Sequence, residues 1–289
     1  MNRTPRWRIL APVVVAGAFL VLTALERRRP LRRAREPKWR HLSRNIVFAG
    51  AAAATVNLLE RPVVEPLAAV VERRRWGLLY LCRLPRPLHL VVAIVFLDYT
   101  LYVWHVLAHR VSWLWRFHLV HHVDRDLDAS TALRFHAGEL ALSVPWRAVQ
   151  IAAIGVPPDA LRLWQNLVLL SILFHHSNVE LPIEVERLVA RFVVTPRIHG
   201  IHHSIVPEET DSNWSSGLTV WDYLHGTLRL DVPQQAITIG VPAYSTPADV
   251  TLTNSFALPF GAQRPWRVIP GDGEPEAHRH SPTASELAP

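Results

Sequence analysis

The chain contains a single cysteine, Cys82, among its 289 residues. One cysteine cannot form an intramolecular disulfide, and it argues against a metal cluster held by thiolates. Any transition metal in this protein must therefore be bound by nitrogen or oxygen atoms. The sequence also lacks the HExxH motif, the motifs of nucleic-acid-binding folds and any segment typical of a cytochrome. With 49% hydrophobic residues, the chain has enough apolar material for one large core or for a membrane.

Positive charge is concentrated in one segment. The formal net charge is +7, and residues 27–44 (RRRPLRRAREPKWRHLSR) carry nine Arg and Lys residues between two apolar stretches. The positive-inside rule predicts a cytoplasmic loop of this composition between membrane helices. A solvated basic linker is the alternative interpretation. No nucleic-acid partner is expected, because no nucleic-acid-binding motif accompanies the cations.

Five apolar segments predict helices, at residues 9–25, 46–59, 87–109, 140–156 and 160–174. The first is followed by three arginines and not by a small-residue cleavage site, which favours a retained membrane anchor over a signal peptide. The second is ended by Glu60, Arg61 and Pro62, and whether it spans a membrane or only dips into it is open. The last two are joined by the turn signal PPD and predict a helical hairpin. We therefore predict an all-α fold, an integral membrane helical bundle with about four to five membrane helices.

Counting the membrane crossings places the histidine clusters on one side. If the Arg-rich loop is cytoplasmic, segment 87–109 and the predicted hairpin both end on the cytoplasmic side, next to histidines. The bundle is thus expected to carry a cytosolic, His-rich, metal-binding cap. We divide the chain into an N-terminal membrane region (1–86), a domain that carries the histidines (87–230) and a C-terminal extension (231–289). The extension is expected to be disordered from about residue 263, where Pro, Gly and charged residues replace the hydrophobic pattern.

Sixteen histidines are present, and ten of them fall into tight groups. HVLAH places two histidines four residues apart on one helix face, and the pentapeptides HLVHH and HGIHH repeat this spacing with one further histidine each. Neutral imidazole binds Fe, Zn, Cu and Ni, and a single zinc ion needs only three or four ligands. A set of eight to ten therefore predicts two metal ions. The ten candidates are His105, His109, His118, His121, His122, His136, His176, His199, His202 and His203.

Isolated histidines are interpreted differently. A single histidine is more often a hydrogen-bonded core or surface residue than a metal ligand. We therefore predict structural roles for His41, His89, His225, His278 and His280.

The motifs HVLAH, HLVHH, RFHAGE, FHHSNVELP, TPRIHGIHHS and NWSSGLTVWDYLHGT resemble, in order and spacing, those of the fatty acid hydroxylase superfamily, also called the sterol desaturase family. The resemblance runs from about Leu97 to Arg229, nearly half of the chain. It implies that all the candidates above except His136 are metal ligands. His136 matches a further family position, and the resemblance leaves open whether it binds metal directly. The chain departs from the family at Ala137, where the family has Pro, and at His225, where it has Phe.

The resemblance implies a membrane-bound oxygenase with two iron ions that uses O2 to hydroxylate or desaturate a lipid. Its electrons would come indirectly from NAD(P)H, through a reductase and a separate electron-transfer protein that is ferredoxin-like or cytochrome b5-like. Imidazole ligands bring no negative charge, so we predict that nearby carboxylates, above all Asp98 and Asp222, offset the charge of the ions without binding them. A membrane metal-binding or metal-transport protein and a metal-dependent hydrolase are the alternatives from other classes. The residues do not specify the lipid.

Overall fold

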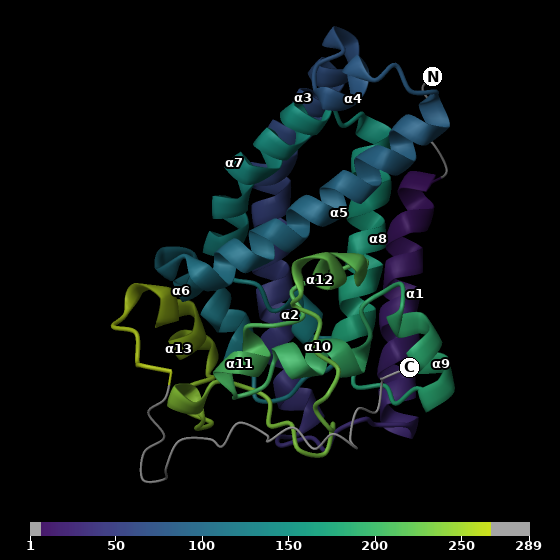
Figure 1. Cartoon of the computed structure of the whole chain (residues 1–289). Helices are drawn as coiled ribbons and strands as arrows, with labels where there is room; N and C mark the ends of the chain where they lie inside the picture. The colour runs from purple at the N-terminus through teal and green to yellow at the C-terminus, as the bar shows by residue number, and fades with distance from the viewer. Residues whose placement is uncertain (1–6, 267–289) are drawn as a thin grey trace.

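The computed structural model describes residues 7–266, which form helices and loops with three isolated β-bridges (Figure 1). The all-α prediction is confirmed for these residues. The long helices are α1 (Trp7–Arg28), α2 (Lys38–Thr55), α3 (Arg61–Arg74), α5 (Arg86–Arg110), α7 (Ala137–Ile154) and α8 (Pro158–His176). The shorter helices are α4 (Leu78–Leu81), α6 (Ser112–His122), α9 (Ile183–Ala190), α10 (Pro196–His202), α11 (Pro207–Thr210), α12 (Val220–His225) and α13 (Leu252–Ala257).

Aliphatic side chains between α3, α5, α7 and α8 form the core of the bundle. Ala68 of α3, Ala93 of α5 and Ile151 of α7 are completely buried there, and Trp164 of α8 is buried beside them. The small alanine side chains let the helices approach closely, and the indole ring fills the space that remains. Close packing of this kind stabilises helices in lipid as well as in water, because dispersion contacts contribute in both solvents.

The second apolar segment does not end where the sequence predicts. α2 continues through a π-helical turn, Val56–Glu60, directly into α3. Pro62 is tolerated because it lies in the first turn of α3, just after the wider π turn, where its fixed φ suits the helix. The predicted end at Glu60, Arg61 and Pro62 is therefore wrong, and the segment is part of a much longer helical stretch.

Two helical stretches of the described residues are long and apolar enough to cross a membrane. They are Lys38–Leu81, which includes α2, α3 and α4, and Arg86–Arg110, which is α5. Leu58 and Val91 on these stretches are 73% and 58% exposed, as expected for side chains that face lipid. The other predicted segments lie in α1, α7 and α8, and the total of four to five membrane helices stays a prediction.

The turn signal PPD joins α7 to α8, as predicted. α7 is capped by Gly155 in a left-handed conformation (φ 89°), and α8 begins at Pro158. The two helices are not the packed arms of a hairpin, however, because α5 lies between them and packs against both (Figure 1). His89 of α5 fixes the turn, since its Nε2 lies 2.9 Å from the carbonyl oxygen of Gly155.

Gly77, just before α4, touches the same turn. Its φ is 101°, and a Cβ on Gly77 would lie 2.3 Å from the backbone of Gly155. We expect Gly77→Ala to lower the free energy of unfolding by at least about 2 kcal/mol, because both the conformation and the contact exclude a side chain. Thermal unfolding of the protein in detergent measures this loss. Gly50→Ala is the control, since nothing lies within 4 Å of a Cβ there; equal melting temperatures for the two variants would contradict the prediction.

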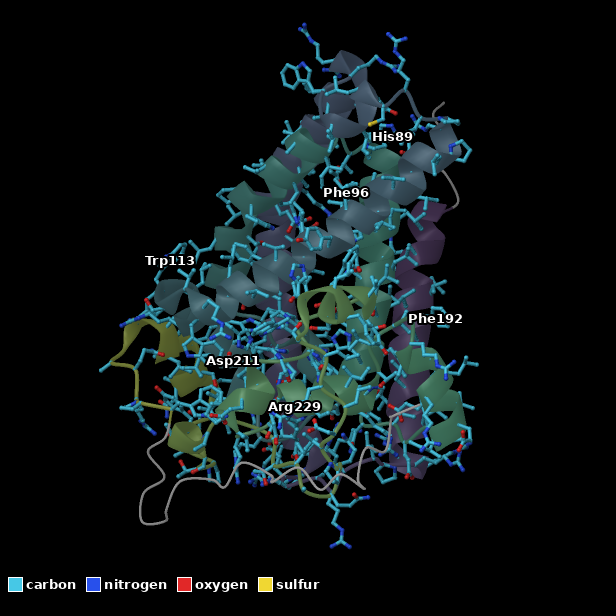
Figure 2. All side chains as sticks on the ribbon, viewed as in Figure 1. His89, Phe96, Trp113, Phe192, Asp211 and Arg229 are labelled. Atoms are coloured by element: carbon cyan, nitrogen blue, oxygen red, sulfur yellow. The ribbon has the colours of Figure 1, made fainter. Side chains whose placement is uncertain are left out.

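All the shorter helices except α4 form a cap at one end of the bundle (Figure 1). Asp211 and Arg229 lie in this cap, whereas His89 lies near the other end (Figure 2). The chain beyond residue 230 covers part of the cap: the ring of Trp266 lies 5.6 Å from that of Trp115, and its Nε1 donates to the carbonyl oxygen of Ile205 at 3.1 Å. Residues 267–289, where most of the predicted disorder falls, lie outside the described residues.

Candidate metal centre

Nine of the ten candidate histidines converge in two groups where the bundle meets the cap. Within each group, one ring nitrogen of every histidine lies within 4.8 Å of those of the others. The two groups adjoin, because the rings of His122 and His203 stack with centroids 4.4 Å apart. The first group comprises His105, His109, His118, His122 and His202, and the second comprises His121, His176, His199 and His203.

The HxxHH pattern shows why one pentapeptide can serve both groups. In α6, His118 and His122 lie one turn apart and enter the first group, whereas His121 enters the second. The third and fourth positions after a helical residue differ by about 100° around the axis, so they point to different neighbours. In HGIHH the assignment is reversed: the first and last histidines enter the second group, and the middle one enters the first. α5 and α8 supply the other members from their last two turns.

In the second group, imidazole nitrogens face one another at close range. Nε2 of His176 lies 2.9 Å from Nε2 of His121 and 3.1 Å from Nε2 of His199, which lies 3.1 Å from Nε2 of His203. Lone pairs at this separation repel. Nitrogens that share a metal ion at about 2.0–2.1 Å are held about 2.9–3.4 Å apart. The spacing therefore fits the donor set of a metal ion.

In the first group, several ring nitrogens are buried without partners. Nε2 of His109, His118 and His202, and both nitrogens of His122, have no hydrogen-bond partner among the described residues. Each buried polar atom without a partner costs about 1–3 kcal/mol, so such a concentration in one place requires a bound group to satisfy it. A metal ion fits, because it accepts several nitrogen lone pairs at once.

The pKa values of these histidines favour the neutral ring. Burial, reinforced by neighbouring histidines, lowers the pKa of His121, His199 and His203 well below its usual value. Burial also lowers the pKa of His202 to about 3, although the carbonyl oxygen of Ser212 favours its charged form. Since neutral imidazole is the form that binds metals, these rings are available as ligands at neutral pH.

On several of these rings, Nδ1 faces an oxygen atom while Nε2 faces the other histidines. Nδ1 of His105 lies 2.7 Å from the carbonyl oxygen of Trp214, and Nδ1 of His118 lies 2.9 Å from Oε1 of Glu139. An N–H on Nδ1 leaves Nε2 free for a metal and fixes the orientation of the ring. The sequence analysis missed Glu139, although it belongs to the RFHAGE motif.

Removing this support should weaken metal binding without removing a ligand. We expect Glu139→Ala to lower the affinity for metal by about 10- to 100-fold, since the ring of His118 is then no longer oriented. Glu139→Gln should retain most of the affinity, because its amide oxygen can still accept from Nδ1. Competition with a chelator, followed by metal analysis, measures both. An alanine variant that retains metal as well as wild type would contradict this role.

Two histidines differ from the predicted set. His136 lies in neither group: it caps α7, where its Nδ1 accepts from the backbone N–H of Gly138 at 3.0 Å, and its Nε2 lies 3.3 Å from the carbonyl oxygen of Phe256. Both ring nitrogens of His136 are therefore occupied, and the geometry does not support metal binding by this residue. His175, which was not a candidate, is completely buried with its ring centroid 4.1 Å from that of His199. Its only sequence signal was its position next to His176.

The two predicted carboxylates contact loops and not histidines. Asp98 accepts from the backbone N–H of Leu218 at 3.0 Å and from Nε1 of Trp221 at 2.7 Å, and so ties the loop before α12 to α5. Asp222 accepts from the backbone N–H of Trp214 at 3.0 Å. Because the carbonyl oxygen of Trp214 holds His105, Asp222 is linked to the first histidine group through one intervening residue.

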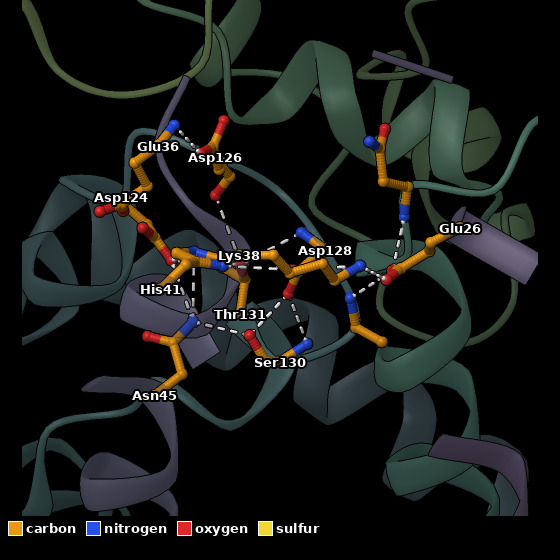
Figure 3. Close-up of polar contacts among 12 residues, drawn as sticks. Glu26, Glu36, Lys38, His41, Asn45, Asp124, Asp126, Asp128, Ser130 and Thr131 are labelled. Carbon is orange, nitrogen blue, oxygen red and sulfur yellow. Dashed lines mark hydrogen bonds and ion pairs between the residues drawn. The ribbon is translucent and has the colours of Figure 1, made fainter. Parts of the chain in front are cut away.

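Three of the isolated histidines, His41, His89 and His225, lie outside both groups. His225 is exposed and stacks on the ring of Tyr102, with centroids 5.0 Å apart. His278 and His280 lie outside the described residues. His41 is buried between two carboxylates (Figure 3): Nε2 lies 2.7 Å from Asp124 and Nδ1 lies 3.2 Å from Asp128. His41, Asp124 and Glu36 lie close enough together to hold a metal ion. Both ring nitrogens of His41 are already hydrogen-bonded, however.

Asp128 gives this network a predictable response to acid. Burial raises the pKa of Asp128, but hydrogen bonds from His41 and Ser130 outweigh burial and lower it. Its stabilising contribution is therefore present above the ordinary carboxyl pKa of about 3.9 and is lost as the pH falls through the depressed value. We expect Asp128→Asn to cost about 1–2 kcal/mol at pH 7, and its difference from wild type to shrink toward pH 3. Thermal unfolding across this range tests it; a difference that does not change with pH would contradict it.

An opening connects the first group to the surface. It has a volume of about 240 Å³ and is lined by His109, Trp115, Trp266 and residues of α11. At its rim, Arg110 pairs with Asp211 at 3.1 Å. A small apolar group can therefore approach the first group between two indole rings.

The sequence profile of the fatty acid hydroxylase family matches residues 90–227, and this stretch contains every histidine of both groups. Residues 90–227 belong to the fatty acid hydroxylase family. This fatty acid hydroxylase domain begins in α5 and ends just after α12. The segment that brings Trp266 to the opening lies beyond it.

Curated relatives resemble this domain over part of their length. The ornithine lipid hydroxylase OlsE of Rhizobium tropici is 31% identical over 158 residues, which is 54% of this chain and 46% of the relative. Alkylglycerol monooxygenase of Homo sapiens is 28% identical over 46% of this chain and 29% of the relative. A cholesterol 25-hydroxylase-like protein of Danio rerio is 30% identical over 53% of this chain and 61% of the relative. The chain thus spans less than two thirds of each of these relatives. No solved structure matches it.

Proposed function

We propose that this protein is a membrane-bound, O2-dependent di-iron hydroxylase that acts on a lipid. One observation carries the proposal: two adjoining groups of histidines, nearly all of them buried, lie at the end of α5, a helix that is long and apolar enough to cross a membrane. The names of the relatives support it, since they are hydroxylases and a monooxygenase for ornithine lipid, alkylglycerol and cholesterol. All three substrates are lipids, whereas their head groups and ring systems differ.

The residues of the two groups have defined roles in this proposal. Each group would hold one iron ion, and the bound ions supply the activation of O2 and the oxidation of a C–H bond that no acid or base can ionise. The histidines fix the ions from α5, α6, α8 and α10, and their burial keeps bulk water away. The carbonyl oxygen of Trp214 and Glu139 orient the rings. We infer that the substrate reaches the first group through the opening at His109, on the cytoplasmic side of the membrane.

The stoichiometry of hydroxylation requires two electrons in addition to the substrate and O2. The substrate RH, one O2, two electrons and two protons give ROH and water. Carboxylates and histidines cannot supply the electrons, so they must come from outside the chain. We propose an electron-transfer protein that is reduced, through a reductase, by NAD(P)H.

The proposal is tested by following oxygen from the gas phase into lipids. Cells that express the protein are grown under ¹⁸O2, and their lipids are compared by mass spectrometry with those of cells that express His203→Ala. We expect a lipid that gains one ¹⁸O atom with the wild-type protein only. A product whose oxygen comes from water would identify a hydrolase or a hydratase. A product that loses two hydrogens and gains no oxygen would identify a desaturase.

Metal transport is the alternative of another class, and the same cells separate it from catalysis. A transporter would change the metal content of the cells and leave their lipids unchanged. Transporters place their ligands near the middle of the bilayer, on broken helices. The histidines of this protein lie in the last turns of α5 and α8 and in the cap, which favours an enzyme.

A further inference from the structure

A second cavity, of about 950 Å³, lies at the polar end of the molecule. Its walls come from the connection between α1 and α2, the loop after α6, Asn178 after α8, and residues 234–239. The connection between α1 and α2 lies at the opposite end of the molecule from α4 (Figure 1). The cavity therefore opens away from the exposed aliphatic side chains of the bundle, into the surrounding solution.

The carboxylates of this cavity are satisfied from within the protein. Each of the four accepts a hydrogen bond or ion pair from a neighbouring group, as Figure 3 shows for most of them. They therefore contribute little negative charge toward solvent. The carboxylates belong to Glu26, Glu36, Asp126 and Asp128, and their partners are Lys38, Arg44, the backbone N–H of Arg35 and the ring of His41.

The cations at the rim of the cavity, unlike its carboxylates, are not paired with neighbouring groups among the described residues. Arg27, Arg33 and Arg35 line the cavity and are exposed, and their side chains make no hydrogen bond or ion pair within the part of the chain that the structure describes. Three uncompensated guanidinium groups around one cavity attract an anionic partner and raise its rate of association.

The wall of the cavity is connected to the second histidine group. His41 lines the cavity and is bonded to Asp124, whose backbone N–H donates to the carbonyl oxygen of His121 at 3.4 Å. Asn178, also in the wall, follows His176 by two residues. His121 and His176 both belong to the second group, whereas the opening at His109 leads to the first. The opening thus reaches the first group directly, whereas the cavity is linked to the second group through His41 and Asp124.

Arg32 ties the basic connection to α10. Its Nη2 donates to the carbonyl oxygen of Pro196 at 2.7 Å and to Oε1 of Gln234 at 2.6 Å. Its guanidinium fills the space beside Gly200, since a Cβ there would lie 1.7 Å from Nη2. Gly200 is the second residue of HGIHH, so the Arg-rich loop contacts the helix that carries the second group.

We propose that this cavity is the docking site of a small acidic electron-transfer protein that reduces the metal centre through the second group. The inference rests on the proposed function, which requires two electrons from outside the chain for each hydroxylation. Two reduced carriers each give one electron, and the electrons, one O2, two protons and the C–H bond become C–OH and water. The first group is then left free to receive the lipid through the opening at His109.

The shape of the site favours a protein over a membrane surface. A bilayer is flat and would meet only the outermost arginines, whereas an acidic loop on the surface of a folded protein can place a few side chains in a cavity of this size. Hydrogen bonds also connect the cavity wall, through His41 and Asp124, to His121. Binding of a lipid head group does not require this connection, whereas electron transfer to the second group can use it.

The test compares two double variants of equal charge. Arg33→Glu/Arg35→Glu changes the rim of the cavity. Arg73→Glu/Arg191→Glu is the control, since both of its residues are exposed and neither lines the cavity. The probe is a plant-type [2Fe–2S] ferredoxin, which is strongly acidic, and the full-length, iron-loaded protein is held in detergent. Binding is measured by biolayer interferometry at several salt concentrations, and reduction of the iron by stopped-flow absorbance.

We expect the rim variant to bind ferredoxin at least about 10-fold more weakly than wild type at low salt, with the difference shrinking as salt screens the charges. Its iron should be reduced about 10-fold more slowly by ferredoxin but at the wild-type rate by reduced methyl viologen, a small cation that needs no docking site. The control should match wild type in both measurements. Equal binding by the rim variant and wild type overturns the inference, and so does an equal loss in the control.

Two further outcomes are distinguishable. If the rim variant loses binding to vesicles that contain phosphatidylglycerol while it binds ferredoxin as wild type does, the cavity contacts a membrane and the inference is wrong. Failure of the proposed hydroxylation leaves the binding and reduction measurements intact, because neither requires a lipid substrate. The docking site and the reaction are therefore tested separately.

Discussion

Replacing His203 with alanine is expected to reduce the bound iron from two ions toward one per chain and to lower product formation at least about 100-fold. His203 belongs to the second group, and its Nε2 lies 3.1 Å from that of His199. Loss of one nitrogen from a four-histidine group leaves three ligands, which hold the ion more weakly and alter its coordination. The remaining ion cannot compensate, because the proposed reaction uses both. Metal analysis of the purified protein and the lipid assay measure the two effects.

A histidine outside both groups provides the control. His225→Phe removes an exposed ring that stacks on Tyr102, and it should leave both the iron content and the activity near wild type. His109→Ala, in the first group, leaves four histidines and should weaken the binding of the other ion. If His203→Ala binds as much iron as His225→Phe does, the assignment of the second group to a metal is wrong.

Replacing Asp124 with asparagine is expected to cost about 3 kcal/mol of stability, which corresponds to a melting temperature about 6–12 °C lower. Burial raises the pKa of Asp124, but the nearby cations His41 and Arg134 outweigh it and hold the pKa well below its usual range. The carboxylate is completely buried and lies 2.7 Å from Nε2 of His41. Without its charge, His41 and Arg134 remain buried with less compensation, and a broken buried ion pair is strongly destabilising.

The same substitution should also reach the metal centre, since Asp124 follows His122 by two residues and its N–H holds the carbonyl oxygen of His121. Thermal unfolding in detergent gives the stability, and metal analysis gives the occupancy. Asp211→Asn is the matched control, because its ion pair with Arg110 is largely exposed and should contribute less than about 1 kcal/mol. A loss in Asp124→Asn no larger than in this control would show that the buried network is not stabilising.

The sequence was most informative where chemistry depends on local spacing. HVLAH, HLVHH and HGIHH each set two histidines one helical turn apart, and this geometry is fixed by the helix itself. Nine of the ten candidate histidines accordingly lie in the two groups. His136 matched a motif but serves as a helix cap, because the backbone N–H of Gly138 needed an acceptor. The other contact of the ring, between Nε2 and the carbonyl oxygen of Phe256, joins distant parts of the chain and is visible only in the structure.

Helix ends were less predictable than helix interiors. Glu60, Arg61 and Pro62 have the composition of a terminus, but a π turn allows the chain to continue into α3. In the same way, PPD identified the turn between α7 and α8 and could not reveal that α5 separates them. Turn chemistry acts over a few residues, whereas the packing of helices depends on side chains far apart in the chain.

By itself, the sequence determined the helical fold class, the exclusion of thiolate ligands and the identity of nearly all the converging histidines, since these follow from composition and from the period of the helix. The tertiary structure alone decided how the histidines divide into two groups, that Glu139 supports His118, and that a cavity with an arginine rim is linked to the second group through His41 and Asp124. Those features join residues as distant as Arg32 and Gly200, and the physical reason is that neither local propensity nor spacing carries information about which distant surfaces meet.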